Sequence, residues 1–167
     1  MGLDQEETRH IWVIRHGKSA DGSPGMLDHD RPLNGRGRRN GESMRAWYAE
    51  QAHPAEWIWC SPAVRAQQTA QFVADGFGAP IVDEPDLYLA PAERLLDCLQ
   101  RTPEDIASVA VVAHNPGLTY LVNLLGNEPV TDNLITFGSA LFSTQCSWTD
   151  LRFGGAELVS LHTPRTI

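Results

Sequence analysis

A short apolar run that ends in a charged tripeptide is the feature of this chain that most constrains its fold. Ile11-Trp12-Val13-Ile14 leads directly into Arg15-His16-Gly17. Consecutive apolar residues are typical of a strand that is buried on both faces, as in a parallel sheet covered by helices. In such sheets ligands bind beyond the carboxyl ends of the strands. The run therefore predicts a buried strand that delivers a cation and an imidazole to a binding edge.

Two further apolar runs also end in polar residues. Residues 109–113 precede His114, and residues 57–60 precede Ser61-Pro62 and then Arg65. Because the carboxyl ends of parallel strands meet at one edge of a sheet, we expect these strand ends to lie close together. The sequence therefore predicts two arginines and two histidines at the same edge.

Helical patterns alternate with the expected strands. We expect a polar surface loop over 18–33, and the regular elements follow it along the chain. The expected helices cover 36–50, 62–74 with Pro62 as first residue and Gly76 or Gly78 at the end, 91–99, and 118–125 with Asn115 as cap. The other expected strands cover 81–82, 140–145 and 158–162. This alternation predicts an α/β fold, a three-layer sandwich with a mostly parallel central sheet flanked by helices.

Length and charge narrow the class of protein. We expect 167 residues to form one domain, with residues 1–8 as a flexible N-terminus. A formal charge of -8 argues against a general partner such as nucleic acid or an anionic membrane. No apolar run approaches the roughly 18 residues that span a bilayer, and the acidic start is unlike a signal peptide. We therefore expect a cytoplasmic protein.

The cysteines favour structural roles. Cys60, Cys98 and Cys146 are odd in number and have no Cys-x-x-Cys spacing. A cysteine phosphatase loop needs five residues between its thiolate and its arginine, whereas Cys60 and Arg65 enclose four. Pro62 also removes one of the amide donors that such a loop would use. We interpret all three thiols as buried and reduced.

The residues at the strand ends suit phosphoryl transfer. A phosphoryl group in transfer spreads negative charge over three oxygens, so its site needs several fixed donors around one nucleophile. Arg15, Arg65 and His114 can supply donors, and a neutral His16 nitrogen can attack phosphorus. The other His16 nitrogen must then hold a proton that is bonded elsewhere. Gly17 is expected to let the backbone turn sharply beneath the imidazole.

Four separated motifs carry a family resemblance. They are Arg15-His16-Gly17, Arg31-Pro32-Leu33-x-x-x-Gly37, Ser61-Pro62-x-x-Arg65-Ala66-x-Gln68-Thr69, and His114-Asn115. In this order they resemble the histidine phosphatase superfamily with its phosphoglycerate-mutase-like fold, and most of all its short SixA-like phosphohistidine phosphatases. The resemblance implies that His16 is the phosphorylated nucleophile and that Arg15, Arg65 and His114 hold the phosphoryl oxygens. It also implies Arg31 at the pocket rim, inorganic phosphate as product, and no metal or organic cofactor.

The chain departs from the larger members of this family in its general acid. Their acid follows the third strand in a Leu-x-Glu setting, where this chain reads Leu87-Tyr88-Leu89. Glu84 or Asp86 upstream is the alternative acid, or there is none. An imidazole leaving from phosphohistidine can carry its own proton, so a site without an acid is better matched to a P–N bond. The long insertion that roofs larger relatives is also absent, and an open pocket could admit a protein surface.

Other interpretations stay open beside this one. From the residues alone, Arg31 and the cluster Arg36, Arg38 and Arg39 are interpreted as a solvated helix face in preference to a role at the pocket. Asp28-His29-Asp30 contains metal-ligand types, but adjacent residues rarely converge on one ion, so we expect no metal. For function, a phosphatase of phosphohistidine on a protein is the first hypothesis. A phosphomonoesterase of small metabolites and a non-catalytic phosphoryl-binding module are the alternatives.

Overall fold

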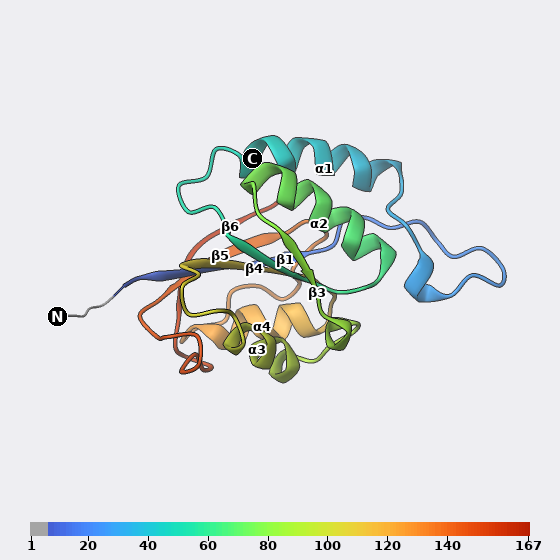
Figure 1. The fold of residues 1–167 in the computed structure, drawn as a ribbon. Helices are drawn as coiled ribbons and strands as arrows, with labels where there is room; N and C mark the ends of the chain where they lie inside the picture. Colours follow the sequence, from blue (N-terminus) through green and yellow to red (C-terminus); the bar gives the residue numbers. More distant parts are fainter. Residues whose placement is uncertain (1–6) are drawn as a thin grey trace.

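A central sheet lies between two layers of helices in the computed structural model, which describes residues 7–167 (Figure 1). Most of the segment that we expected to be flexible, residues 1–6 of 1–8, lies outside the described residues. Thr8 is described, and its hydroxyl accepts a hydrogen bond from Gln145. No helix among the described residues is long and apolar enough to cross a membrane.

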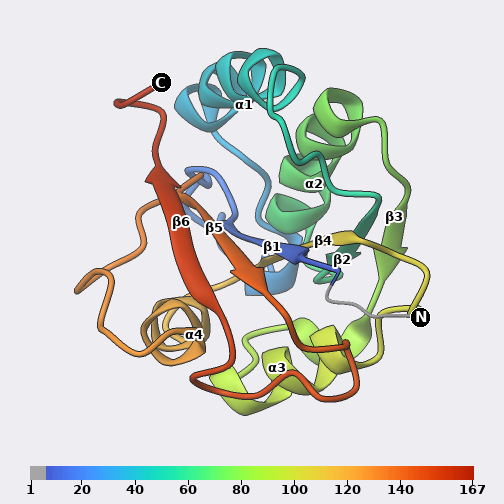
Figure 2. The same cartoon turned by 90° about the vertical axis from the view of Figure 1, so that its left-hand side faces the viewer.

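The sheet has six strands in the order β3-β2-β4-β1-β5-β6. β1 to β4 are mutually parallel where they pair, β5 is antiparallel to β1, and β6 is antiparallel to β5. The strands are β1 (Arg9–Arg15), β2 (Trp57–Cys60), β3 (Ile81–Asp83), β4 (Ser108–Ala113), β5 (Ser139–Thr144) and β6 (Glu157–His162). The prediction of a mostly parallel sheet in a three-layer α/β sandwich is confirmed (Figure 2).

Two pairs of helices cover the two faces of the sheet. Figure 1 shows α1 and α2 above the sheet and α3 and α4 below it. Their bounds are α1 (Gly35–Tyr48), α2 (Val64–Phe77), α3 (Ala92–Gln100) and α4 (Gly117–Leu125), with short 3-10 turns at η2 (Asp28–Asp30) and η3 (Pro85–Leu87). α2 begins two residues later than expected. Pro62 therefore precedes the helix instead of opening it, and Gly78 ends it in the left-handed conformation with a φ of 75°.

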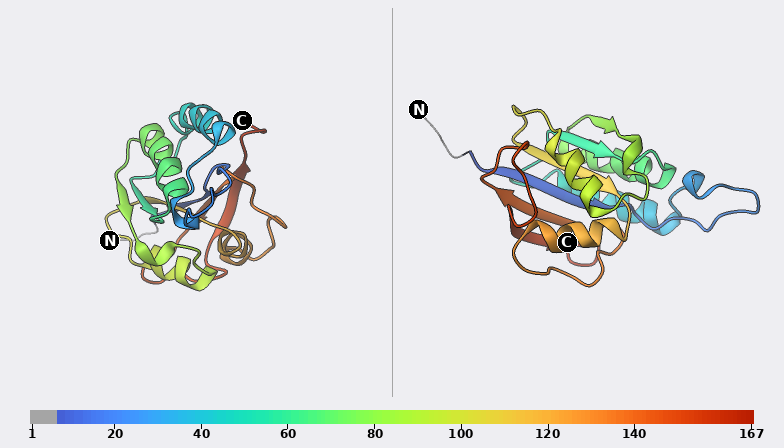
Figure 3. Two further views of the ribbon diagram at one scale, coloured as in Figure 1. Left: turned by 90° about the vertical axis from the view of Figure 1, so that its right-hand side faces the viewer. Right: turned by 90° about the horizontal axis from the view of Figure 1, so that it is seen from below.

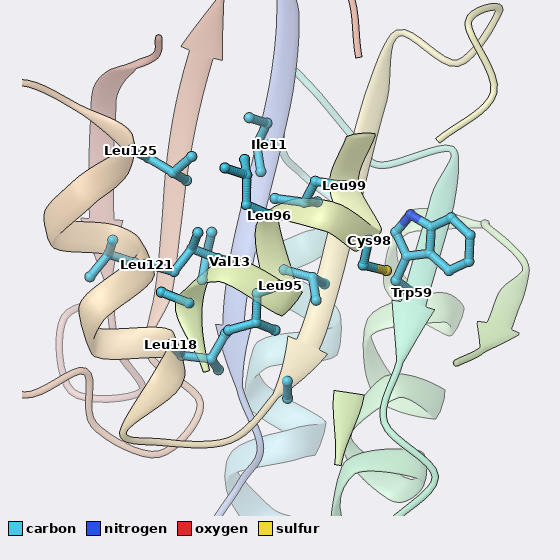
Figure 4. Packing of buried hydrophobic residues seen from close by; sticks show 14 of the residues in the cluster. Ile11, Val13, Trp59, Leu95, Leu96, Cys98, Leu99, Leu118, Leu121 and Leu125 are labelled. Carbon is cyan, nitrogen blue, oxygen red and sulfur yellow. The ribbon is translucent and has the colours of Figure 1, made fainter. Parts of the chain in front are cut away.

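Alternating side chains of the central strands explain both cores. In β1, Ile11 and Val13 pack with the leucines of α3 and α4 (Figure 4). Trp12 and Ile14, between them in sequence, point to the other face and pack against α1 and α2. Successive residues of a strand face opposite sides, so an unbroken apolar run is what a strand covered on both sides requires.

The chain connections place a crevice at the carboxyl ends of β1 and β4. These strands are adjacent and parallel. β1 leads to α1 on one face, whereas β4 leads to α4 on the other, so the two connections diverge. Ligands bind in open α/β sheets at such switch points. Residues 18–33 leave β1 here and project beyond the sheet, at the end opposite the N-terminus (Figure 3).

Candidate active site

Three strand ends lie level at this edge of the sheet. The backbone N–H of His16, after β1, donates to Ala113 O at 3.2 Å at the end of β4. The N–H of Ser61, after β2, donates to Val112 O at 3.1 Å. The structure therefore brings the three predicted strand ends together, and Arg15, His16, Arg65, His114 and Arg31 all line one pocket of about 350 Å³.

The His16 ring is held by its own neighbour. Its Nδ1 lies 2.7 Å from the carbonyl oxygen of Gly17. A carbonyl can only accept, so Nδ1 carries the proton and Nε2 keeps its lone pair. Burial, opposed by this hydrogen bond and reinforced by the charges of Arg65 and Arg15, lowers the pKa of His16 to about 4. His16 is therefore neutral at pH 7 and has a free ring nitrogen.

The lack of a side chain at Gly17 leaves room for a neighbouring ring. Its φ is not positive, and a Cβ at this position would collide with the Phe137 ring. The Gly17 N–H donates to Thr69 Oγ1 at 2.9 Å, and the Thr69 hydroxyl donates to Arg65 O at 2.8 Å. Thr69 thus ties α2 to the turn that carries His16.

His114 is oriented by Ser61. Its Nε2 lies 2.7 Å from Ser61 Oγ, which accepts a bond from the Ala63 N–H at 3.3 Å. In the tautomer in which the Ser61 hydroxyl donates to Nε2, the His114 proton lies on Nδ1. Nδ1 is buried and has no partner among the described residues. Burial first, and then the charges of His16 and Arg65, lower the pKa of His114 to about 3.

The two arginines at the pocket are buried to different degrees. Arg65 is 3% exposed, whereas Arg15 is half-buried and donates to Leu134 O at 3.1 Å. Burial, followed by the charge of Arg65, lowers the pKa of Arg15. The Nε atoms of both arginines are buried and lack a partner in the described part of the chain. Buried donors without partners are costly.

Asp28, on the loop over the pocket, pairs with Arg31 of the same loop and with Arg65 of the pocket. Its Oδ1 accepts from Arg31 Nε at 3.0 Å, and its Oδ2 accepts from Arg65 Nη2 at 3.1 Å. Oδ2 also accepts from the Tyr88 hydroxyl at 2.5 Å. This last bond is the main reason that the pKa of Asp28 lies well below its usual range, with Arg31 and Arg65 lowering it further. Asp28 therefore stays ionised at neutral pH.

Neither candidate acid lines the pocket. Glu84 accepts from Arg101 at 2.8 Å and from the Asp86 N–H at 3.1 Å, and these two interactions lower its pKa. Asp86 is exposed and, like Glu84, is outside the pocket lining. Leu89 does line the pocket and is 53% exposed. Asp28 is the only carboxylate among the described lining residues.

Cys60 and the 28–30 segment make contacts that suit neither a reactive thiolate nor a metal site. Cys60 is buried, and this burial raises the pKa of its thiol well above the usual range. Asp28, one of the metal-ligand types of the segment, is engaged with two arginines and a tyrosine instead. Arg31 is not a solvated side chain of α1: it precedes the helix and its Nη1 donates to Ser19 Oγ and Ala20 O, both at 2.8 Å.

Sequence reasoning missed the partnership of Asp28 and Tyr88. In the sequence, Asp28 stands out only as a metal-ligand type, and Tyr88 only as part of the stretch that lacks an acid. They lie 60 residues apart, in two irregular segments, and no periodicity or spacing links them. The lining also includes Lys18, Ser19, Asn115 and Thr136. Of these, Asn115 is not the cap of α4 as expected: Pro116 occupies the N-cap position, and Asn115, one residue before it, accepts from the Thr119 N–H at 3.1 Å.

Known proteins share this arrangement of sequence and fold. A family model for the histidine phosphatase superfamily (branch 1) matches residues 11–88. An uncharacterised protein of Mycobacterium tuberculosis is 30% identical over 161 residues, which cover 91% of this chain and all of that protein. The phosphohistidine phosphatase SixA of Escherichia coli is 32% identical over 116 residues, which cover 67% of this chain and 71% of SixA. A solved structure from Nakamurella multipartitia that carries the SixA name has a TM-score of 0.86 at 25% identity, covering 96% of this chain and 99% of that one.

This chain belongs to the histidine phosphatase superfamily. It is therefore a phosphatase with the phosphoglycerate-mutase-like fold. Within the superfamily it is SixA-like, in agreement with the resemblance that its four motifs predict.

Proposed function

We propose that this phosphatase dephosphorylates phosphohistidine on proteins through a covalent phosphohistidine at its own His16. The observation that carries the proposal is the ionisation state of the carboxylate in the pocket. Asp28 is the only carboxylate in the described lining, and its bond with Tyr88 keeps it ionised. The pocket therefore offers no carboxylic acid to protonate an alkoxide, whereas an imidazole leaves with its own proton.

The proposed roles follow the contacts of each side chain. The substrate reacts with its second ring nitrogen protonated. Nε2 of His16 attacks phosphorus, the electron pair of the breaking P–N bond returns to the substrate ring, and the ring leaves as neutral imidazole with that N–H. Arg15, Arg65 and the Nδ1–H of His114 hold the equatorial oxygens, and Arg31 adds positive charge at the rim. Water then attacks the phosphorus on His16, which releases inorganic phosphate and restores the free imidazole. No step requires a metal or an organic cofactor.

An open pocket mouth supports a protein as the substrate. Leu27 is 68% exposed on the projecting loop beside Asp28, and Leu89 is 53% exposed in the pocket lining. A phosphohistidine ring must reach Nε2 of His16 while its own backbone stays outside, and an open mouth allows this approach.

The test compares P–N with P–O substrates on the full chain. Turnover of a phosphohistidine protein is measured beside a panel of sugar phosphates, and acid-labile labelling of the chain by phosphoramidate reports the intermediate. We expect faster P–N turnover, a label that His16→Ala abolishes, and a label that the control His162→Ala retains. Robust turnover of the sugar phosphates would favour the metabolite phosphatase. Binding of phosphate without label or turnover would favour the phosphoryl-binding module.

A further inference from the structure

Asp28 makes contacts that neither catalysis nor metal binding accounts for. Its backbone oxygen accepts from Arg65 Nη1 at 2.8 Å while its side chain accepts from Arg65 Nη2 at 3.1 Å. One residue therefore holds both terminal nitrogens of the guanidinium. Because Arg65 is 3% exposed, this two-point contact fixes the plane of a buried cation instead of pairing a mobile surface charge.

The same carboxylate joins three segments that meet only at the pocket. Asp28 lies in η2 on the projecting loop, Arg65 lies in the first turn of α2, and Tyr88 follows η3. The Tyr88 ring lies 5.6 Å from the His114 ring, edge to face, so the network also reaches the second pocket histidine. Arg31 completes the network on the loop side.

We propose that Asp28 is a positioning residue that aims the Arg65 guanidinium at the phosphoryl group, with Tyr88 holding the carboxylate in place. This inference rests on the proposed function, because it takes Arg65 as a phosphoryl ligand. A transition state is sensitive to the placement of its donors, and a displacement of about 1 Å can cost on the order of 100-fold in rate. A guanidinium that Asp28 holds in place still has N–H groups available to donate to the phosphoryl oxygens.

If Asp28 acted on the pocket through its charge alone, its loss would change anion affinity in the opposite direction. An ionised carboxylate in the pocket lining repels a phosphoryl dianion, so removing its charge should tighten anion binding. A residue that aims Arg65 should instead weaken binding when it is lost, although the pocket becomes more positive. The sign of the change in affinity therefore separates a positioning residue from a competing internal anion.

The experiment measures binding of orthovanadate and of inorganic phosphate to the full chain by calorimetry, for the wild type, Asp28→Asn, Tyr88→Phe and Asp30→Asn. Vanadate imitates the five-coordinate transition state and phosphate the ground state. Asp30→Asn is the matched control, because Asp30 lies in the same turn and its side chain pairs, among residues 7–167, with His29 alone, at 3.4 Å. Far-ultraviolet circular dichroism and the thermal midpoint check that each variant folds.

For Asp28→Asn we expect vanadate binding to weaken by about 10- to 100-fold, phosphate binding to weaken less, and kcat to fall more than KM rises. Tyr88→Phe should give a smaller loss of the same sign, and it decides the matter if Asp28→Asn does not fold. Asp30→Asn should stay near the wild type. Unchanged or tighter vanadate binding by the folded variants overturns this inference alone. A wild type that binds no vanadate overturns the proposed function, and this inference with it.

Discussion

At the scale of single residues, the pocket gathers arginines and histidines, and burial determines the protonation state of its two imidazoles. His16 and His114 are 7% and 2% exposed, and both have a pKa well below that of a free imidazole. The proposed function requires a neutral nucleophilic imidazole at His16, and burial disfavours the charged form of that imidazole. The strand-end pattern predicted these residues, but it contained no information on Asp28 or Tyr88, whose contacts depend on how two loops fold.

The lowered pKa of His16 predicts a loss of stability in mild acid. Its pKa is about 4 in the fold and 6.5 in the unfolded chain. Between these values the unfolded state binds more protons, so the stability present above pH 6.5 falls as the pH falls towards 4. On going from pH 7 to pH 5, the His16→Asn variant should lose roughly 1 to 2 kcal/mol less free energy of unfolding than the wild type.

Urea unfolding at both pH values, in buffer free of phosphate, checks this prediction. Phosphate must be left out because a bound anion would favour the charged imidazole. Equal losses in the wild type and in His16→Asn would show that His16 does not titrate with a lowered pKa.

At the scale of elements, the sequence motifs correspond to contacts between helices and the pocket loop. Gln68 of α2 accepts from the Leu33 N–H at 2.8 Å, and Asn34 caps α1 by accepting from the Gly37 N–H at 2.8 Å. Element types and most bounds could be predicted, because apolar runs and helical spacing are local signals. The start of α2 could not, because Pro62 is compatible both with the first turn of a helix and with the extended segment before it.

Gly37 in α1 should not tolerate a side chain. A Cβ there would collide with the backbone oxygen of Lys18, next to the His16 turn. Gly37→Ala should therefore lower the free energy of unfolding by about 1 to 3 kcal/mol, despite the higher helix propensity of alanine.

Gly35→Ala is the matched control in the same helix. Outside the backbone of α1, the described part of the chain places only the flexible end of Arg39 near its Cβ, at 3.1 Å. We expect it to be neutral or slightly stabilising in chemical denaturation. Equal effects of the two substitutions would mean that α1 does not pack against the pocket backbone as described.

At the scale of the whole molecule, one sheet separates two cores and carries the site at its edge. The apolar runs of β1 and β4 predict a sheet covered on both faces, and the structure confirms it. The strand order, with β4 between β1 and β2, could not be predicted. A fully buried strand can pair with any other apolar strand, so its sequence does not specify its neighbours. This order is what brings His16 and His114 to within 5.2 Å between ring centroids.

Because both cores share β4, we predict that the chain unfolds in one cooperative transition. Val111 faces the α3 and α4 side, and Val112 faces the α1 and α2 side. Val111→Ala and Val112→Ala should each lower the free energy of unfolding by about 2 kcal/mol. Tryptophan fluorescence and far-ultraviolet circular dichroism should follow the same unfolding curve in both variants. Two separate transitions would mean that the layers on the two faces fold independently.

The most direct test of the account is a crystal structure of the chain with orthovanadate. We expect vanadium bonded to Nε2 of His16, with equatorial oxygens within hydrogen-bond distance of Arg15, Arg65 and His114. Vanadate bound through another residue, or a guanidinium of Arg15 or Arg65 turned out to solvent in the complex, would contradict it.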